Sequence, residues 1–314
     1  MIRKRLSIFS ADKIWMNVRK GISIVCVIII LIVGLDFFNQ LLINKNCLKK
    51  CTPFFSGEQE YDVLFFGSSH VQMGVSILDL FHDYGITGYN LAVEGNFIQS
   101  NYYKMKFVLE YLVKEKRQLP KVIVMDIFDD EQNISHLHSA WDSYPLSLDK
   151  WKMTNRLVPE EEHYPMLVPF LLYHKRWNEL TQDDFQPYIN KTFGTSNGGY
   201  GVGKADRENV IKITDIVEID EDTATCVRQM KEMCKKLDIQ LIFIHIPYSY
   251  KPEIQRKANG IYQYAEANGI LCVDYMNEDI GIDFDIDFFD EGHLNRAGMR
   301  IVTDEIGRLL SGGG

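Results

Sequence analysis

Short apolar runs alternate with longer segments of helical periodicity along most of this chain. Residues 63–66, 88–91, 122–127, 241–245 and 271–273 have the length and composition of buried strands. Residues 77–84, 98–115, 223–237, 254–268 and 296–310 repeat apolar side chains every three to four positions, which is typical of helices. The alternation predicts an α/β fold, a three-layer sandwich in which helices cover both faces of a parallel sheet of about five strands.

An apolar segment near the N-terminus is long enough to cross a membrane. Residues 21–43 exceed the roughly 20 residues that span a bilayer. The basic residues in the preceding tail, residues 1–20, indicate that this tail stays in the cytoplasm. A cleaved signal peptide is the alternative, but no small-x-small cleavage site follows the apolar run. We therefore expect a single-pass protein of the cell membrane, with a linker at 44–60 and an extracytoplasmic domain at 61–310.

The outer end of this segment carries polar residues. Asp36 and Asn39 lie about one helical turn apart, and Gln40 extends the same face. One interpretation places them at the level of the lipid headgroups, where polar side chains cost little. The other is a polar contact with a partner membrane protein.

Charge and cysteine content limit the functional classes. The net charge of −9 and the pI near 5.4 argue against a nucleic-acid partner, which needs a basic surface. Six cysteines in 314 residues are too few for a disulfide scaffold. Cys47 and Cys51 stand close together after the apolar segment, and the sequence leaves open whether they pair.

Two short motifs more than two hundred residues apart contain the residue types of a nucleophilic site. Gly67-Ser68-Ser69 follows the first predicted strand, and Asp290 and His293 stand three residues apart before the last predicted helix. A serine nucleophile needs a base, and the base needs an acid to orient it. The alternative is structural: Ser69 would cap a helix, and the Asp290–His293 pair would cap the last one.

These motifs resemble the blocks that open and close the SGNH (GDSL-like) hydrolase superfamily. The resemblance implies that Ser69 is the nucleophile, His293 the base and Asp290 its orienting acid. It also implies an oxyanion hole built from the backbone N–H groups of Ser69 and Gly95, the latter in segment 89–96. The superfamily's Gly-x-Asn-Asp block has no asparagine here, so Asn96 is the candidate for the third donor.

The membrane segment together with Phe65-Phe66-Gly67-Ser68-Ser69-His70 resembles the cell-envelope branch of that superfamily, which includes the D-alanine transfer protein of teichoic acid export and the alginate O-acetylation proteins. This implies an esterase or O-acyltransferase that acts on acyl groups, O-acetyl above all, of an envelope polysaccharide or wall polymer. A membrane-bound acyl-donor protein is an expected partner, and no metal or cofactor is expected. The alternative is a non-catalytic anchored protein that binds polysaccharide or scaffolds an envelope assembly.

Residues 131–215 interrupt the alternation of strands and helices. They contain the aromatic residues Tyr164, Phe170, Tyr173 and Trp177 but little clean periodicity. Such a long segment inside a compact domain is usually functional. We expect a cap or substrate channel over the active edge of the sheet.

Overall fold

The computed structural model describes residues 2–43, 53–55, 57, 59–129, 133–185, 212–248, 252–290 and 292–312. The chain forms two compact units. One combines Met1–Ile43 with Val168–Gln186, and the other combines Asn44–Leu167 with Pro187–Gly314. Cys47, Cys51 and residues 186–211 lie outside the described residues, so the question of a Cys47–Cys51 disulfide stays open.

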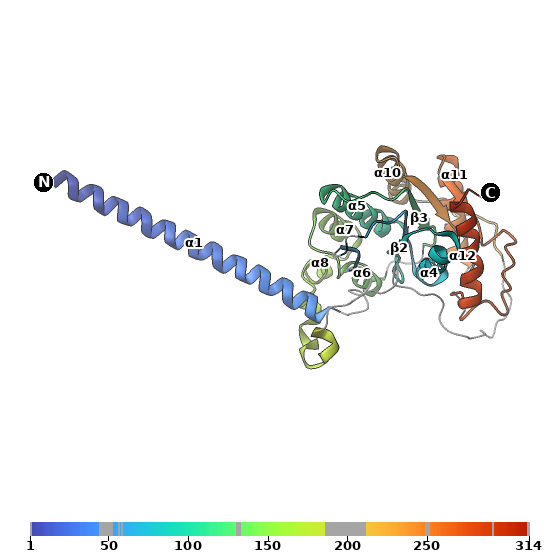
Figure 1. The fold of residues 1–314 in the computed structure, drawn as a ribbon, viewed down its shortest axis with the longest axis horizontal. Helices are drawn as coiled ribbons and strands as arrows, with labels where there is room; N and C mark the ends of the chain where they lie inside the picture. Colours follow the sequence, from blue (N-terminus) through green and yellow to red (C-terminus); the bar gives the residue numbers. More distant parts are fainter. Residues whose placement is uncertain are drawn as a thin grey trace. The chain divides into compact units, whose positions relative to one another are not determined.

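The larger unit is built on a five-stranded parallel sheet with the order β2-β1-β3-β4-β5 (Figure 1). Its strands are β1 Val63–Phe66, β2 Gly88–Asn90, β3 Val122–Asp126, β4 Gln240–Ile244 and β5 Leu271–Val273. Three predicted strands ran one residue too far, to Leu91, Ile127 and His245. Each of these residues still donates a backbone hydrogen bond to the neighbouring strand, but the chain then turns away.

Helices flank every strand of this sheet. They are α3 Ser69–Gly74, α4 Ile77–Tyr84, α5 Ile98–Lys114, α6 Ile134–Trp141, α7 Leu148–Leu157, η1 Glu160–Glu162, α8 His163–Leu167, α10 Glu221–Lys236, α11 Pro252–Ala267 and α12 Arg296–Leu310. α10 begins two residues earlier than expected because the Asp220 carboxylate accepts a hydrogen bond from the backbone N–H of Thr223 and caps the helix. Apolar periodicity alone does not detect such a polar first turn.

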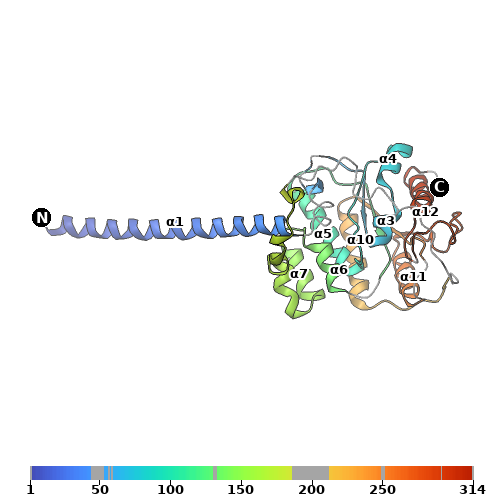
Figure 2. The same cartoon turned by 90° about the horizontal axis from the view of Figure 1, so that it is seen from below.

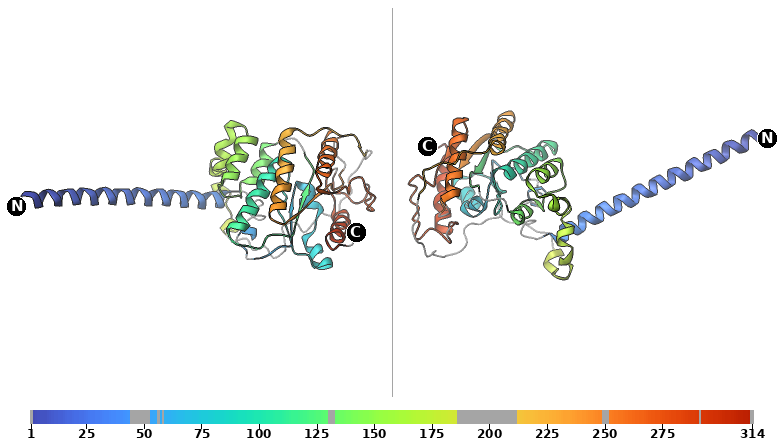
Figure 3. Two further views of the ribbon diagram at one scale, coloured as in Figure 1. Left: turned by 90° about the horizontal axis from the view of Figure 1, so that it is seen from above. Right: turned by 180° about the vertical axis from the view of Figure 1, so that it is seen from behind.

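Successive side chains of each strand enter different cores. Leu64 and Phe66 of β1 pack in the core beneath α5, α10 and α11, whereas Val63 and Phe65 pack beneath α3, α4 and α12. α3 lies beside α12 on that second face (Figure 2). On the first face α5 and α10 run side by side (Figure 3). The sheet is therefore buried on both sides, and the expected α/β class and three-layer arrangement are confirmed.

The smaller unit contains α1 Ile2–Leu42, α9 Phe170–Tyr173 and the short 3-10 helices η2 His174–Asn178 and η3 Gln182–Phe185. From Trp15 to Leu42, α1 is long and apolar enough to cross a membrane. The segment includes the predicted anchor except for its last residue, Ile43. The helix begins before the apolar run because nothing in the basic tail breaks it.

The polar residues of α1 have partners within the same chain. The Gln40 amide donates a hydrogen bond of 2.8 Å to Asp36. The Asn39 side chain accepts one of 2.6 Å from the backbone N–H of Phe170. Asn39, at least, thus has a structural role that does not require a second membrane protein.

Candidate active site

A tight turn after β1 presents two serines with different roles. Gly67 has φ of +150°, a conformation that side-chain-bearing residues rarely adopt, and a Cβ there would lie 2.4 Å from the Cβ of Asp126. Ser68 is the N-cap of α3, and its hydroxyl accepts from the backbone N–H of His70. Ser69 is the first residue of the helix and is 6% exposed. The capping role considered for Ser69 is therefore filled by its neighbour.

The loop before α12 brings a histidine to Ser69. The Nε2 atom of His293 lies 2.8 Å from the Ser69 hydroxyl oxygen. On the other side of the ring, Nδ1 lies 2.9 Å from both carboxylate oxygens of Asp290. Because an ionised carboxylate only accepts hydrogen bonds, Nδ1 carries the proton and Nε2 is left to accept from the serine. The three residues named from the sequence thus converge in hydrogen-bonding order.

Local contacts hold this loop in place. Asp290 also accepts hydrogen bonds of 2.8 Å from the backbone N–H groups of Gly292 and His293. Asn295 caps α12 by accepting from the N–H groups of Ala297 and Gly298. Burial alone would raise the pKa of Asp290, but these hydrogen bonds and that of the His293 ring lower it overall. The acid is therefore held ionised beside the imidazole.

Asp126 anchors the turn Gly67–Ser69 from the adjacent strand. It ends β3, is 1% exposed, and its Oδ2 accepts 2.5 Å and 3.3 Å hydrogen bonds from the hydroxyl and backbone N–H of Ser68. Its Oδ1 accepts from the N–H of Phe128 at 3.1 Å. Burial raises the pKa of Asp126, and the Ser68 hydrogen bonds oppose that rise. The sequence alone does not show that β3 pairs with β1, so this role of Asp126 appears only in the structure.

His70 lies behind the catalytic candidate His293. Its Nδ1 is 3.0 Å from the Ser68 hydroxyl, and its ring is stacked on the His293 ring at 5.3 Å between centroids. The rings of Phe128 and Tyr248 pack against the His70 ring, at 4.0 Å and 4.9 Å between centroids. Burial, then the neighbouring His293 and His245, lower the pKa of His70 well below its usual value. A neutral, buried ring thus supports the orientation of His293.

The turn after β2 lies against the turn Gly67–Ser69. The N–H of Val93 donates to the carbonyl of Gly67 at 3.1 Å, and that of Glu94 donates to the Gln72 side chain at 2.8 Å. Gly95 follows with φ of +64°. Within the described part of the chain, the N–H groups of Ser69 and Gly95 have no hydrogen-bond acceptor.

The position of Gly95 also requires glycine for steric reasons. A Cβ at Gly95 would lie 2.0 Å from Nδ1 of His136 on α6. Asn96, the candidate third donor, directs its amide nitrogen to the Asn101 side chain at 2.5 Å. In the structure this amide links the turn to α5, and the prediction that it is the third oxyanion donor stays a prediction.

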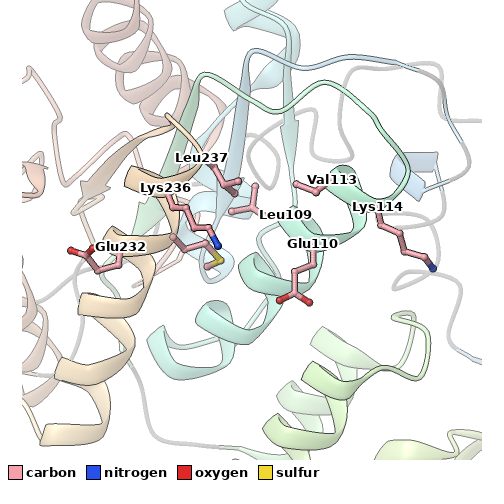
Figure 4. A pocket seen from close by; sticks show the side chains of 8 residues that line it. Leu109, Glu110, Val113, Lys114, Glu232, Lys236 and Leu237 are labelled. Atoms are coloured by element: carbon pink, nitrogen blue, oxygen red, sulfur yellow. The ribbon is translucent and has the colours of Figure 1, made fainter.

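Other candidate sites are separate from these residues. Among the described residues, no three or more His, Cys, Asp or Glu side chains are grouped to hold a metal ion. A cavity of about 500 Å³ lies between α5 and α10 (Figure 4). Its lining is Leu109, Glu110, Val113, Lys114, Glu232, Met233, Lys236 and Leu237. No residue of the Ser69–His293–Asp290 set borders it.

No protein-family model matches this sequence, and a comparison with curated proteins finds no match. Among solved structures, the chain is similar to a candidate acylhydrolase from Bacteroides fragilis at 13% identity and a TM-score of 0.41, covering 82% of this chain and 93% of that one. A GDSL-like lipase from Bacteroides thetaiotaomicron is similar at 12% identity and a TM-score of 0.41, and the match covers 85% of this chain and 98% of that one. An acetylxylan esterase from Geobacillus stearothermophilus is similar at 12% identity and a TM-score of 0.38, and the match covers 82% of this chain and 95% of that one.

Proposed function

We propose that this protein is a serine ester hydrolase or O-acyltransferase of the SGNH type. The observation that carries the proposal is the continuous chain of hydrogen bonds from Ser69 through His293 to Asp290. In that order the arrangement provides a nucleophile, a base and an orienting acid. The resemblance of the two sequence motifs to that superfamily supports the same assignment.

The reaction would proceed in two steps. As the Ser69 oxygen attacks an ester carbonyl, its proton moves to Nε2 of His293, and Asp290 stabilises the imidazolium that forms. The backbone N–H groups of Ser69 and Gly95 are the proposed oxyanion donors, each contributing roughly 3 kcal/mol. His293 then protonates the departing alcohol, which leaves an acyl-serine. Water or an acceptor hydroxyl then gives its proton to His293 and attacks the acyl carbon. The bond between that carbon and the Ser69 oxygen breaks as His293 returns the proton to Ser69.

The substrate we propose is an acylated, most simply O-acetylated, polymer of the cell envelope. α1 would hold the protein in the cell membrane with the site outside the cytoplasm, where such polymers are modified. The resemblance to the envelope branch supports this substrate class and a membrane-bound acyl-donor protein as partner. The direction of acyl movement is decided by which hydroxyl, water or polymer, enters the second step.

The test uses the full chain in detergent or nanodiscs with p-nitrophenyl acetate as substrate. We expect release of p-nitrophenol by the wild-type protein and its loss in Ser69→Ala. Ser311→Ala is the matched control, because this serine lies exposed at the end of α12. Acetylated oligosaccharide, added with and without an unacetylated acceptor, then separates hydrolysis from transfer.

A non-catalytic anchored protein is the competing function. It is supported by the missing asparagine of the Gly-x-Asn-Asp block and by the hydrogen bond from the Asn96 amide to Asn101. Polymer acylation in cells that carry Ser69→Ala distinguishes the two functions. Acylation equal to wild type, with the variant present at normal level in the membrane, would favour the scaffold.

A further inference from the structure

Residues 168–185, which we call the collar, pack on the C-terminal end of α1. The backbone N–H of Phe170 donates to the Asn39 side chain at 2.6 Å, and the Phe170 and Phe38 rings lie 6.4 Å apart. The Arg176 guanidinium donates to the backbone carbonyl of Leu42 at 2.6 Å. The collar and α1 belong to the same compact unit.

These contacts place the collar at one defined level of the anchor. The last four carbonyls of a helix have no partner within the helix, and a cation at that end is favoured by the helix dipole. Arg176 fills both needs at Leu42, where the apolar segment Trp15–Leu42 stops. If α1 spans a bilayer, its end and the collar lie together at the outer boundary between hydrocarbon and headgroups.

The collar exposes large apolar side chains at this level. Leu171 is 48% exposed, Leu172 43%, Trp177 71% and Phe185 64%. On the adjoining turn of α1, Phe37 is 58% exposed. Such a grouped apolar surface marks an interaction site. A tryptophan next to a membrane span suits the interfacial region of a bilayer.

We propose that the collar is a membrane-interface element whose Leu171, Leu172, Trp177 and Phe185 side chains insert among the outer headgroups. The apolar side chains of the collar are exposed in the same compact unit as those of the apolar helix α1, which identifies the occupant of this surface as lipid. The exposed Lys175 lies among them and can reach anionic headgroups. The Arg176 guanidinium is instead held by the Leu42 carbonyl and by Glu179, 3.5 Å away. The inference rests on the proposed membrane anchor and is independent of the catalytic assignment. It gives Phe170 an anchor-facing role and Trp177 a lipid-facing one.

The test uses the four tryptophans of the intact chain, Trp15, Trp141, Trp151 and Trp177. The full-length protein is placed in nanodiscs containing phosphatidylcholine brominated near the headgroup end of its acyl chains, and fluorescence quenching is measured. Trp177→Phe is compared with Trp151→Phe, a matched control because Trp151 is 51% exposed on α7 in the other unit. Trp15→Phe reports on the anchor, and buried Trp141 is left unchanged.

We expect the lipid-dependent quenching to fall in Trp177→Phe and to stay at the wild-type level in Trp151→Phe. A fall in Trp15→Phe with none in Trp177→Phe leaves the anchor standing and overturns the collar proposal. An equal fall in Trp177→Phe and Trp151→Phe also overturns it, because the contact would then not be specific to the collar. If lipid-dependent quenching falls in neither Trp15→Phe nor Trp177→Phe, both the membrane anchor and the collar proposal are overturned. Esterase activity measured in the same samples tests the catalytic site separately.

Discussion

The Ser68 hydroxyl donates a hydrogen bond of 2.5 Å to the Asp126 carboxylate and so ties the end of β1 to the end of β3. This hydrogen bond also fixes the position of Ser69, the next residue. A buried carboxylate that accepts from a hydroxyl and two backbone N–H groups has its full stabilising effect only while all three donors stay aligned. The proposed nucleophile is thus held by a residue that takes no part in the proposed chemistry.

Replacement of Asp126 should therefore reduce stability before it affects chemistry. Asp126→Ala leaves three donors without an acceptor, two of them on Ser68, and each buried donor costs about 1–3 kcal/mol. Asp126→Asn keeps one acceptor oxygen and should lose less. Urea unfolding of the detergent-solubilised chain measures both. Equal stability of Asp126→Ala and wild type would contradict the proposed tether.

Gly67→Ala tests the close approach of the turn to β3. The new Cβ would lie 2.4 Å from the Asp126 Cβ in a backbone conformation unfavourable for alanine. We therefore expect the free energy of unfolding to fall by roughly 2 kcal/mol or more. Gly85→Ala is the control, because Gly85 has φ of +68° but nothing within 4 Å of its Cβ position. In Gly85→Ala the free energy of unfolding should fall by only about 1 kcal/mol, the cost of placing an alanine at positive φ. A comparable loss in both variants would exclude the steric contact as the cause.

The proposed triad predicts a non-additive pattern of activity. Ser69→Ala and His293→Ala should each reduce kcat/KM for p-nitrophenyl acetate by about 10³-fold or more, and the double variant should lose no more than either single variant. Asp290→Asn should also reduce kcat strongly, because the amide favours the wrong imidazole tautomer. Multiplicative losses in the double variant would mean that Ser69 and His293 act independently.

Stability should fall as the pH is lowered through the range below about 6.5. The pKa of His70 is well below its usual value in the folded protein, so the unfolded chain binds a proton that the native chain does not. This contribution is fully present above the unfolded pKa and is lost progressively below it. Unfolding midpoints between pH 7.5 and 5.5 should shift less in His70→Phe than in wild type.

The proposed topology predicts protease sensitivity from outside the cell. In intact spheroplasts, added trypsin should cleave the domain at 61–310 and spare the basic tail at 1–20. Lysed spheroplasts provide the control in which both parts are accessible. Full protection of the domain in intact spheroplasts would place it in the cytoplasm and remove the envelope substrate from the proposal.

The periodicity of apolar residues was sufficient to predict the class of this fold. Alternating strands and helices need no tertiary information, because a buried parallel strand and an amphipathic helix each leave their own pattern in the sequence. Ser69, Asp290 and His293 were also recognisable, since the glycine–serine turn and the acid–histidine spacing are local. Gly95 was identified by resemblance, and its positive φ and contact with His136 appear only in the structure.

Other features were decided by tertiary packing alone. The sheet order β2-β1-β3 places Asp126 beside Ser68, 58 residues away in sequence, and no local pattern encodes which strands become neighbours. Likewise, Phe170 meets Asn39 across 131 residues. Local periodicity determines which elements form, because each element's own face must be buried. The choice of neighbour depends on how all faces are buried at once, and only the folded chain resolves that.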